Sequence, residues 1–308
     1  MSGTSGGGPP RIVDLGMIGV AVSWGMNHVI LKHTLGNMQP LALNSVRLSV
    51  GSVVLLSMLW LIERDLRVQP SDLKWFIATG LVGHTLYQYL FIQGLNLTLA
   101  GKTSVILATM PAFVAFITQY MGRESYTMRA WSGIMISLAG VLLVTTGGRG
   151  VDMAQGTLAG DLLIVGATLC WSLYTVLMKP LLGGYSVLKA TALTMAMGTG
   201  PLVLLSVPAL QRQDWVSVTP LSWGALSFSA LVPISLGYIL WSWGVKRIGS
   251  ARTAVYQNIS PVIASIGGLM FLGERWVLVQ MLGAILIVAG VTQVRSGVRP
   301  APAVRTGD

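Results

Sequence analysis

Residues that could bind a metal ion or act in catalysis are few in this sequence. It contains three histidines, one cysteine and ten acidic residues among 308 positions. His28, His33 and His84 form no HxxH motif, and a single cysteine excludes a CxxC motif. Because zinc sites need several such ligands at close spacing, we expect no metal site, no cofactor and no catalytic residue.

One short segment partly matches a nucleotide-binding motif. Gly101-Lys102-Thr103 ends like a phosphate-binding loop, but that loop needs a glycine where Asn96 stands and a strand before it. The acidic residues fall at the ends of apolar runs or between them, so they form no cluster inside a run. A nucleotide-driven pump and a membrane-embedded enzyme are therefore disfavoured.

The composition indicates that lipid, and not water, surrounds most of the chain. Hydrophobic residues make up 53% and charged residues 10%, whereas an ordinary soluble domain is about 25% charged. Crossing a hydrocarbon core takes about 20 residues of helix, and backbone groups in lipid must bond within their own segment. We therefore predict an all-α integral membrane protein with ten transmembrane helices. The predicted spans are 13–34, 40–62, 73–95, 101–121, 128–146, 159–179, 187–207, 221–244, 252–272 and 276–294.

The net charge of +10 has a simple explanation in a membrane protein, and nucleic acid binding is not needed to account for it. Lysine and arginine concentrate in cytoplasmic loops. With the N-terminus inside, 14 of the 20 lysines and arginines lie on that side. We therefore predict a multi-pass protein with both termini cytoplasmic, a disordered cytoplasmic segment at 1–12 and a basic cytoplasmic tail at 295–308.

The chain contains an internal repeat. Residues 14–36 align without gaps on 161–183 with 8 identities in 23, and 94–141 align on 244–291. Each copy holds five predicted spans, so the second copy must enter the membrane from the opposite side. Such inverted repeats enclose a site near the membrane midplane in secondary transporters. We predict two inverted-topology five-helix repeats, 13–146 and 159–294, around a central cavity, with a linker at 147–158. The matched residues include Trp24 with Trp171, Lys32 with Lys179, Pro111 with Pro261 and Glu124 with Glu274.

Several of these motifs resemble a known family. Residues 24–32, WGMNHVILK, followed by Pro40 and Arg47, resemble the first two helices of EamA-type permeases in the drug/metabolite transporter superfamily. Gly273-Glu274 and its partner at 122–124 are similar to that family as well. The resemblance implies ten helices in the membrane, a cavity lined by helices 1–4 and 6–9, and peripheral helices 5 and 10. It also favours a bacterial inner membrane and export, and it implies no particular substrate.

Polar and aromatic side chains share faces of several predicted helices. Trp24, Asn27 and His28 follow one stripe of the first helix, at spacings of three and four residues. Polar groups in lipid are costly, so such faces should turn toward a wet cavity or toward other helices. Trp24 and Trp171 lie about ten residues into their helices, or roughly 15 Å, which is too deep for the interfacial aromatic belt. The candidate substrate-binding residues are Trp24, Asn27, His28, Asn44, Arg47, His84, Tyr87, Gln88, Trp171, Tyr174, Tyr238, Trp241, Tyr256 and Gln257.

Charged residues and prolines at matched positions suggest further roles. Arg47 lies about 10 Å past Pro40, where it either extends outward, forms a structural pair or binds a substrate carboxylate. Pro111 and Pro261 interrupt helices and are candidate hinges. We expect Glu124 and Glu274 to cap helix starts, and the glycines at 133, 140, 283 and 290 to allow close helix packing.

These features predict a secondary or facilitative transporter of a small organic metabolite, such as an amino acid or related amphipathic compound. Two homologous halves would export it by alternating access. An alternative is a proton-coupled exporter of drugs or organic anions, in which His28 or His84 carries the proton. A membrane-embedded enzyme or a non-transporting receptor fits less well. The expected partners are a small-molecule substrate and the lipid bilayer, with no nucleic acid, and the chain is a monomer or a homodimer.

Overall fold

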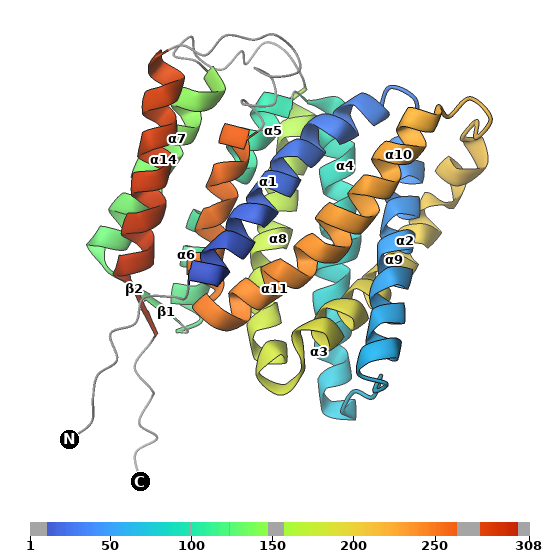
Figure 1. The fold of residues 1–308 in the computed structure, drawn as a ribbon, viewed down its shortest axis with the longest axis horizontal. Coiled ribbons are helices and arrows are strands. Elements are labelled where there is room, and N and C mark those ends of the chain that lie inside the picture. The colour runs from blue at the N-terminus through green and yellow to red at the C-terminus, as the bar shows by residue number, and fades with distance from the viewer. Residues whose placement is uncertain (1–10, 99, 123, 147–156, 264–277, 301–308) are drawn as a thin grey trace.

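A computed structural model describes residues 11–98, 100–122, 124–146, 157–263 and 278–300, and these residues are almost entirely helical (Figure 1). The predicted N-terminal segment up to residue 10, most of the predicted linker, Glu274 and the tail beyond 300 lie outside the described residues.

The first half of the chain forms helices that match the predicted spans closely. Pro40 and Pro70 sit in the first turn of α2 and α3, where a missing N–H group costs nothing. The elements are α1 (Arg11–Thr34), α2 (Pro40–Ile62), α3 (Pro70–Gly80), η1 (Leu81–Leu86), α4 (Tyr87–Leu97), α5 (Ala100–Leu107), α6 (Met110–Tyr120), β1 (Glu124–Tyr126) and α7 (Met128–Thr146).

The second half begins with the same order of elements, namely three α-helices, a π-helical segment and two further α-helices. Thr157, Ser186 and Thr219 each accept a hydrogen bond from the backbone N–H three residues on, so their side chains start the next helix. The elements are α8 (Leu158–Gly184), α9 (Val187–Arg212), α10 (Pro220–Ser229), η2 (Ala230–Leu236), α11 (Gly237–Ile248), α12 (Ser250–Ala254), η3 (Val255–Ile259), α14 (Leu278–Gly297) and β2 (Val298–Pro300).

The helices suit a multi-pass membrane protein. Within the described residues, five stretches are long and apolar enough to cross a membrane: Ile12–Thr34, Pro40–Ile62, Leu158–Gly184, Val187–Arg212 and Pro220–Ile248. Shorter apolar helices cover Val105–Tyr120, Met128–Leu143 and Met281–Val294. Large apolar side chains such as Ile62, Leu204 and Val288 are exposed on the outside, as a lipid-facing surface requires.

Departures from regular α-helix occur at matched places in the two halves. The π-helical segments η1 and η2 interrupt the third predicted span of each half. In the first half, the fourth predicted span is broken between α5 and α6, just before Pro111. In the second half, the fourth predicted span contains the 3₁₀ turn η3, just before Pro261. A proline ring clashes with the carbonyl four residues earlier and lacks an N–H group, which explains the irregular turn ahead of each proline.

Helices α7 and α14 pack side by side at one edge of the molecule (Figure 1). A Cβ built on Gly140 would lie 2.6 Å from the carbonyl oxygen of Gly283, and one on Gly133 would lie 2.9 Å from that of Gly290. The prediction of close glycine packing is thus confirmed. At the end of this pair β1 and β2 join as antiparallel strands, with Ser125 opposite Arg299.

Candidate functional site

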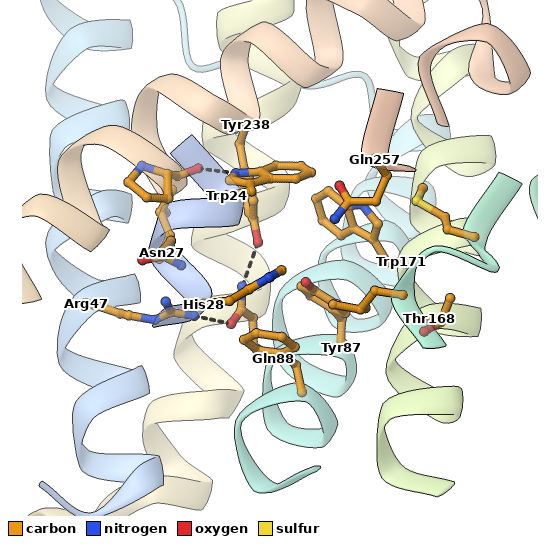
Figure 2. Close-up of a pocket in the computed structure, with 15 residues that line it drawn as sticks. Trp24, Asn27, His28, Arg47, Tyr87, Gln88, Thr168, Trp171, Tyr238 and Gln257 are labelled. Atoms are coloured by element: carbon orange, nitrogen blue, oxygen red, sulfur yellow. Dashed lines mark hydrogen bonds between the residues drawn. The ribbon is translucent and has the colours of Figure 1, made fainter. Parts of the chain in front are cut away.

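A narrow cavity lies between helices of both halves (Figure 2). Its volume is about 30 Å³, which is room for about two water molecules. Side chains of the lining residues therefore fill most of the space that a larger molecule would need. The lining residues are Trp24, Asn27, His28, Arg47, Tyr87, Gln88, Phe91, Leu107, Met110, Thr168, Trp171, Pro233, Ile234, Tyr238 and Gln257.

Aromatic rings from both halves meet at one wall of the cavity. The ring of Trp24 lies 5.5 Å from that of Trp171 in an edge-to-face arrangement, and Tyr87 lies 4.8 Å from Trp171. The indole Nε1 of Trp24 donates a hydrogen bond of 2.9 Å to the backbone carbonyl of Pro233, inside η2. A Cβ on Gly237 would come within 2.8 Å of that nitrogen, so the glycine leaves room for the indole. These contacts fix the orientation of Trp24.

Arg47 is the charged residue of the cavity wall. Its side chain is buried, at 2% exposure. Nε donates to Asn44 Oδ1 at 2.7 Å, Nη1 to Ser229 Oγ at 2.9 Å and Nη2 to Gln88 Oε1 at 2.8 Å. All of these partners are neutral, and no acidic residue is among the described residues that line the cavity. A buried charge without a counter-ion is costly, so this site favours an anionic group from outside the protein.

The partners of Arg47 are themselves held in place. Gln88 Nε2 donates to the hydroxyl of Tyr238 at 2.6 Å, and Asn44 Nδ2 donates to the backbone carbonyl of Gln88 at 2.9 Å. Tyr238 belongs to α11 in the second half, whereas Gln88 belongs to α4 in the first (Figure 2). The network therefore connects the two halves twice, through the Gln88 amide to Tyr238 and through the Arg47 guanidinium to Ser229.

Several polar atoms at the cavity have no hydrogen-bond partner among the described residues. These atoms are Asn27 Oδ1, His28 Nδ1, Gln257 Oε1 and Trp171 Nε1, all of them buried. Leaving a buried polar group unpaired costs about 1–3 kcal/mol. Two of the four are acceptor oxygens and one is an indole donor, so the cavity can bond a ligand that carries both donors and acceptors.

Most of the predicted binding residues reach the cavity, but five do not line it. Asn44, His84, Tyr174 and Trp241 lie behind the wall: Trp241 Nε1 donates to Thr175 Oγ1, and the ring of Tyr174 stacks 4.7 Å from Trp171. Tyr256 donates instead to Asp14 Oδ1 at 2.6 Å, near the start of α1. Its neighbour Gln257 does line the cavity, because the two side chains leave the 3₁₀ turn in different directions.

The prediction missed the apolar part of the lining. Phe91, Leu107, Met110 and Ile234 line the cavity but carry no polar atom that would distinguish them from ordinary core residues. Phe91 was detectable because it shares a helical face with Gln88. Leu107 and Met110 bracket the break before Pro111, which is the other available signal.

The charged residues at the helix ends behave differently from the prediction. Glu124 lies in β1 and not at a helix start, and its carboxylate pairs with Lys179 at 2.8 Å. Lys32 donates to the backbone carbonyls of Leu95 and Thr98, at 2.7 and 3.0 Å. It therefore bonds carbonyls at the end of α4, in addition to lying at the end of its own helix.

Long apolar helices with an apolar outer surface define the chain as a multi-pass membrane protein. The chain belongs to the EamA-like transporter family, whose sequence model matches residues 11–146 and 158–295. The predicted resemblance is thus confirmed.

Known relatives agree with this assignment. The uncharacterized transporter YyaM of Bacillus subtilis is 28% identical over 89% of this chain and 90% of its own length. The uncharacterized transporter YoaV of the same organism is 27% identical over 91% of this chain and 95% of its own length. An uncharacterized transporter of Archaeoglobus fulgidus is 27% identical over 87% and 92%. The structure also aligns with a crystal structure over 92% of this chain and 96% of the other chain, with a TM-score of 0.75 and 17% sequence identity. The two proteins therefore share a fold. The protein is a membrane transporter and not an enzyme.

Proposed function

We propose that this transporter exports a small organic metabolite that carries a carboxylate, such as an amino acid or a related amphipathic compound, across a bacterial inner membrane. The proposal depends on Arg47, a buried cation in the cavity wall whose hydrogen-bond partners are all neutral. A carboxylate can accept two parallel bonds from a guanidinium. Asn27 and Gln257 offer unpaired acceptor oxygens for an ammonium group, and the aromatic rings offer contact for an apolar part.

The proposed topology is ten spans in two inverted repeats, with both termini in the cytoplasm. Three observations support it. The family match falls on two segments of similar length, the π-helical segments occur in the third span of each half, and both fourth spans are irregular before a proline. An odd number of spans in each copy then reverses the second copy in the membrane.

The small volume of the cavity supports alternating access. At about 30 Å³ it cannot hold a metabolite until the walls move apart. At the β1–β2 end the halves are joined by ion pairs of 2.8 Å between Lys179 and Glu124 and between Lys189 and Asp65. We infer that these bonds break when the cavity opens toward that end, with the breaks before Pro111 and Pro261 as hinges.

The test is flux of labelled amino acids from proteoliposomes that contain the full chain. Arg47→Gln should lower the transport efficiency for carboxylates about tenfold to a hundredfold, since a bond to a charged group contributes about 1.5–3 kcal/mol. Arg47→Gln should leave the transport efficiency for amines that lack a carboxylate unchanged. Arg47→Lys should lower the transport efficiency for carboxylates less than Arg47→Gln does. Arg129→Gln, an exposed charge on α7, is the control. Equal losses for acids and amines would contradict the role of Arg47, and no flux of any tested compound would contradict the substrate class.

Proton coupling is the second candidate, and two histidines favour it. His28 Nδ1 and both ring nitrogens of His84 are buried and have no partner among the described residues. A histidine changes its charge close to working pH. In this case a pH gradient should drive flux in the native protein, and His28→Ala or His84→Ala should abolish the gradient effect. Flux that is equal with and without the gradient, and unchanged in both variants, would leave facilitated transport as the mechanism.

A further inference from the structure

A second cavity lies away from the central one and shares no lining residue with it. It occupies about 270 Å³ at the end of the bundle where β1 and β2 pair. The end of α8, the turn from α11 into α12 and the two strands surround it. Four of its lining side chains are basic and one is acidic. The lining residues are Lys179, Lys246, Arg247, Arg252, Glu124, Ile248, Gly249 and Val298.

The positive charge of this cavity is not balanced within the described part of the chain. Lys179 is paired with Glu124 at 2.8 Å. Lys246 donates only to the backbone carbonyl of Tyr185, at 3.1 Å, and Arg252 Nη2 only to that of Val298, at 2.8 Å. The guanidinium of Arg247 has no hydrogen bond or ion pair with any described residue, and Arg252 Nε is buried without a partner.

The local backbone explains why these cations converge. Gly249 ends α11 with a φ of 86°, a left-handed conformation that glycine adopts without strain. The chain therefore turns sharply and brings Arg252 back toward Arg247. A Cβ on Gly249 would lie 3.0 Å from Glu124 Oε1 and 3.6 Å from Lys179 Nζ, so a side chain here would press on the ion pair. Like charges that line one cavity repel one another unless an anion lies between them.

We propose that this cavity binds a phosphate group. Arginine presents a planar set of donors that fits phosphate oxygens in pairs, and Arg252 keeps a buried donor free for it. The cavity lies at helix ends, where the proposed topology puts the lipid headgroups, and basic pockets between transmembrane helices bind anionic headgroups. The phosphate comes either from an anionic phospholipid or from inorganic phosphate in solution. The site shares no lining residue with the central cavity, so this proposal does not rest on the identity of the substrate.

The experiment is native mass spectrometry of the full chain titrated with phosphatidylglycerol, with phosphatidylcholine or with inorganic phosphate. We expect tight binding of one phosphatidylglycerol, weak binding of phosphatidylcholine, and a loss of at least about tenfold in affinity in the variant Arg247→Gln/Arg252→Gln. Lys74→Gln/Arg129→Gln removes the same charge from exposed positions on other helices and should leave binding unchanged.

The outcomes separate the two sources and the proposal itself. Binding of phosphatidylglycerol that inorganic phosphate does not displace assigns the site to lipid, whereas binding of inorganic phosphate alone assigns it to the soluble ion. Arg247→Gln by itself serves if the double variant unfolds, because Arg247 is exposed and unbonded. Native-like binding in the arginine variants, or an equal loss in the control, would overturn the proposal.

Discussion

The guanidinium Nη2 of Arg47 donates to Gln88 Oε1 at 2.8 Å, and this bond connects α2 to α4 at the wall of the central cavity. Gln88 also donates to Tyr238 at 2.6 Å. The amide therefore uses its acceptor and one donor to hold a cation and a phenol at a fixed separation.

We expect Gln88→Leu to raise the KM for carboxylate substrates about tenfold, because the variant loses both bonds, each worth about 1 kcal/mol or more. Maximal flux should fall less, because Asn44 and Ser229 still orient Arg47. Initial rates in proteoliposomes measure both parameters. Gln93→Leu, on the same helix and without a hydrogen bond to any described residue, should have a native KM. An unchanged KM in Gln88→Leu would show that the guanidinium is positioned by other groups.

We expect Trp24→Phe to destabilise the protein by about 1 kcal/mol, because phenylalanine keeps a ring but loses the bond to the carbonyl of Pro233. The midpoint of thermal unfolding in detergent measures this. Trp60→Phe, at a site that is 62% exposed, should have the native midpoint. If the native protein, Trp24→Phe and Trp60→Phe all unfold at the same midpoint, the bond from Trp24 to the carbonyl of Pro233 does not stabilise the fold.

We expect the ion pair between Lys189 and Asp65 to make stability depend on pH at the acidic end. The hydrogen bond from Lys189 lowers the pKa of Asp65 from its usual 3.8. A lowered carboxyl pKa adds stability that is complete above the unfolded value and is lost as the pH falls through the folded value. The difference in unfolding midpoint between the native protein and Asp65→Asn should therefore be constant at neutral pH and shrink below pH 3.8.

A double-mutant cycle isolates this pair. Asp65→Asn in a Lys189→Met background should add no further loss at pH 7. A full additional loss there would show that Asp65 acts through another partner, such as the backbone N–H of Arg67.

We expect Gly140→Ala to lower the unfolding midpoint, because the new Cβ would lie 2.6 Å from the carbonyl oxygen of Gly283 and push α7 away from α14. Gly19→Ala is the matched control, since a Cβ there meets no atom within 4 Å. That variant should be as stable as the native protein or more stable by up to about 1 kcal/mol. Equal effects of the two substitutions would argue against close packing as the reason for Gly140.

The helices were predictable from the sequence because lipid imposes simple rules. Apolar runs and prolines located α2 from Pro40 to Ile62 with the observed bounds. The π-helical segments were not predictable, since residues such as Gly83 and Thr85 fit an α-helix equally well and packing against α9 selects the wider turn. A Cβ on Gly198 would overlap the carbonyl oxygen of Gly80, a contact between helices that no local pattern encodes.

The candidate site was partly predictable for a similar reason. Polar residues are rare in membrane helices, so Asn27, Gln88 and Arg47 were conspicuous. The sequence did not separate residues that line the cavity from those one layer behind, such as His84 and Tyr174, because both sets are polar or aromatic and lie on the same helical faces. Only the rotation of each helix decides which of them reaches the open space.

The bond between Arg47 and Ser229 joins the two halves, since Ser229 lies on α10 and Arg47 on α2. If the halves separate during the cycle, this bond breaks and leaves Nη1 of the buried guanidinium unpaired unless a substrate carboxylate replaces the hydroxyl. The loaded protein would then reorient faster than the empty one. Unlabelled substrate on the far side of the membrane should in that case accelerate the efflux of labelled substrate, which is the kinetic behaviour of an exchanger.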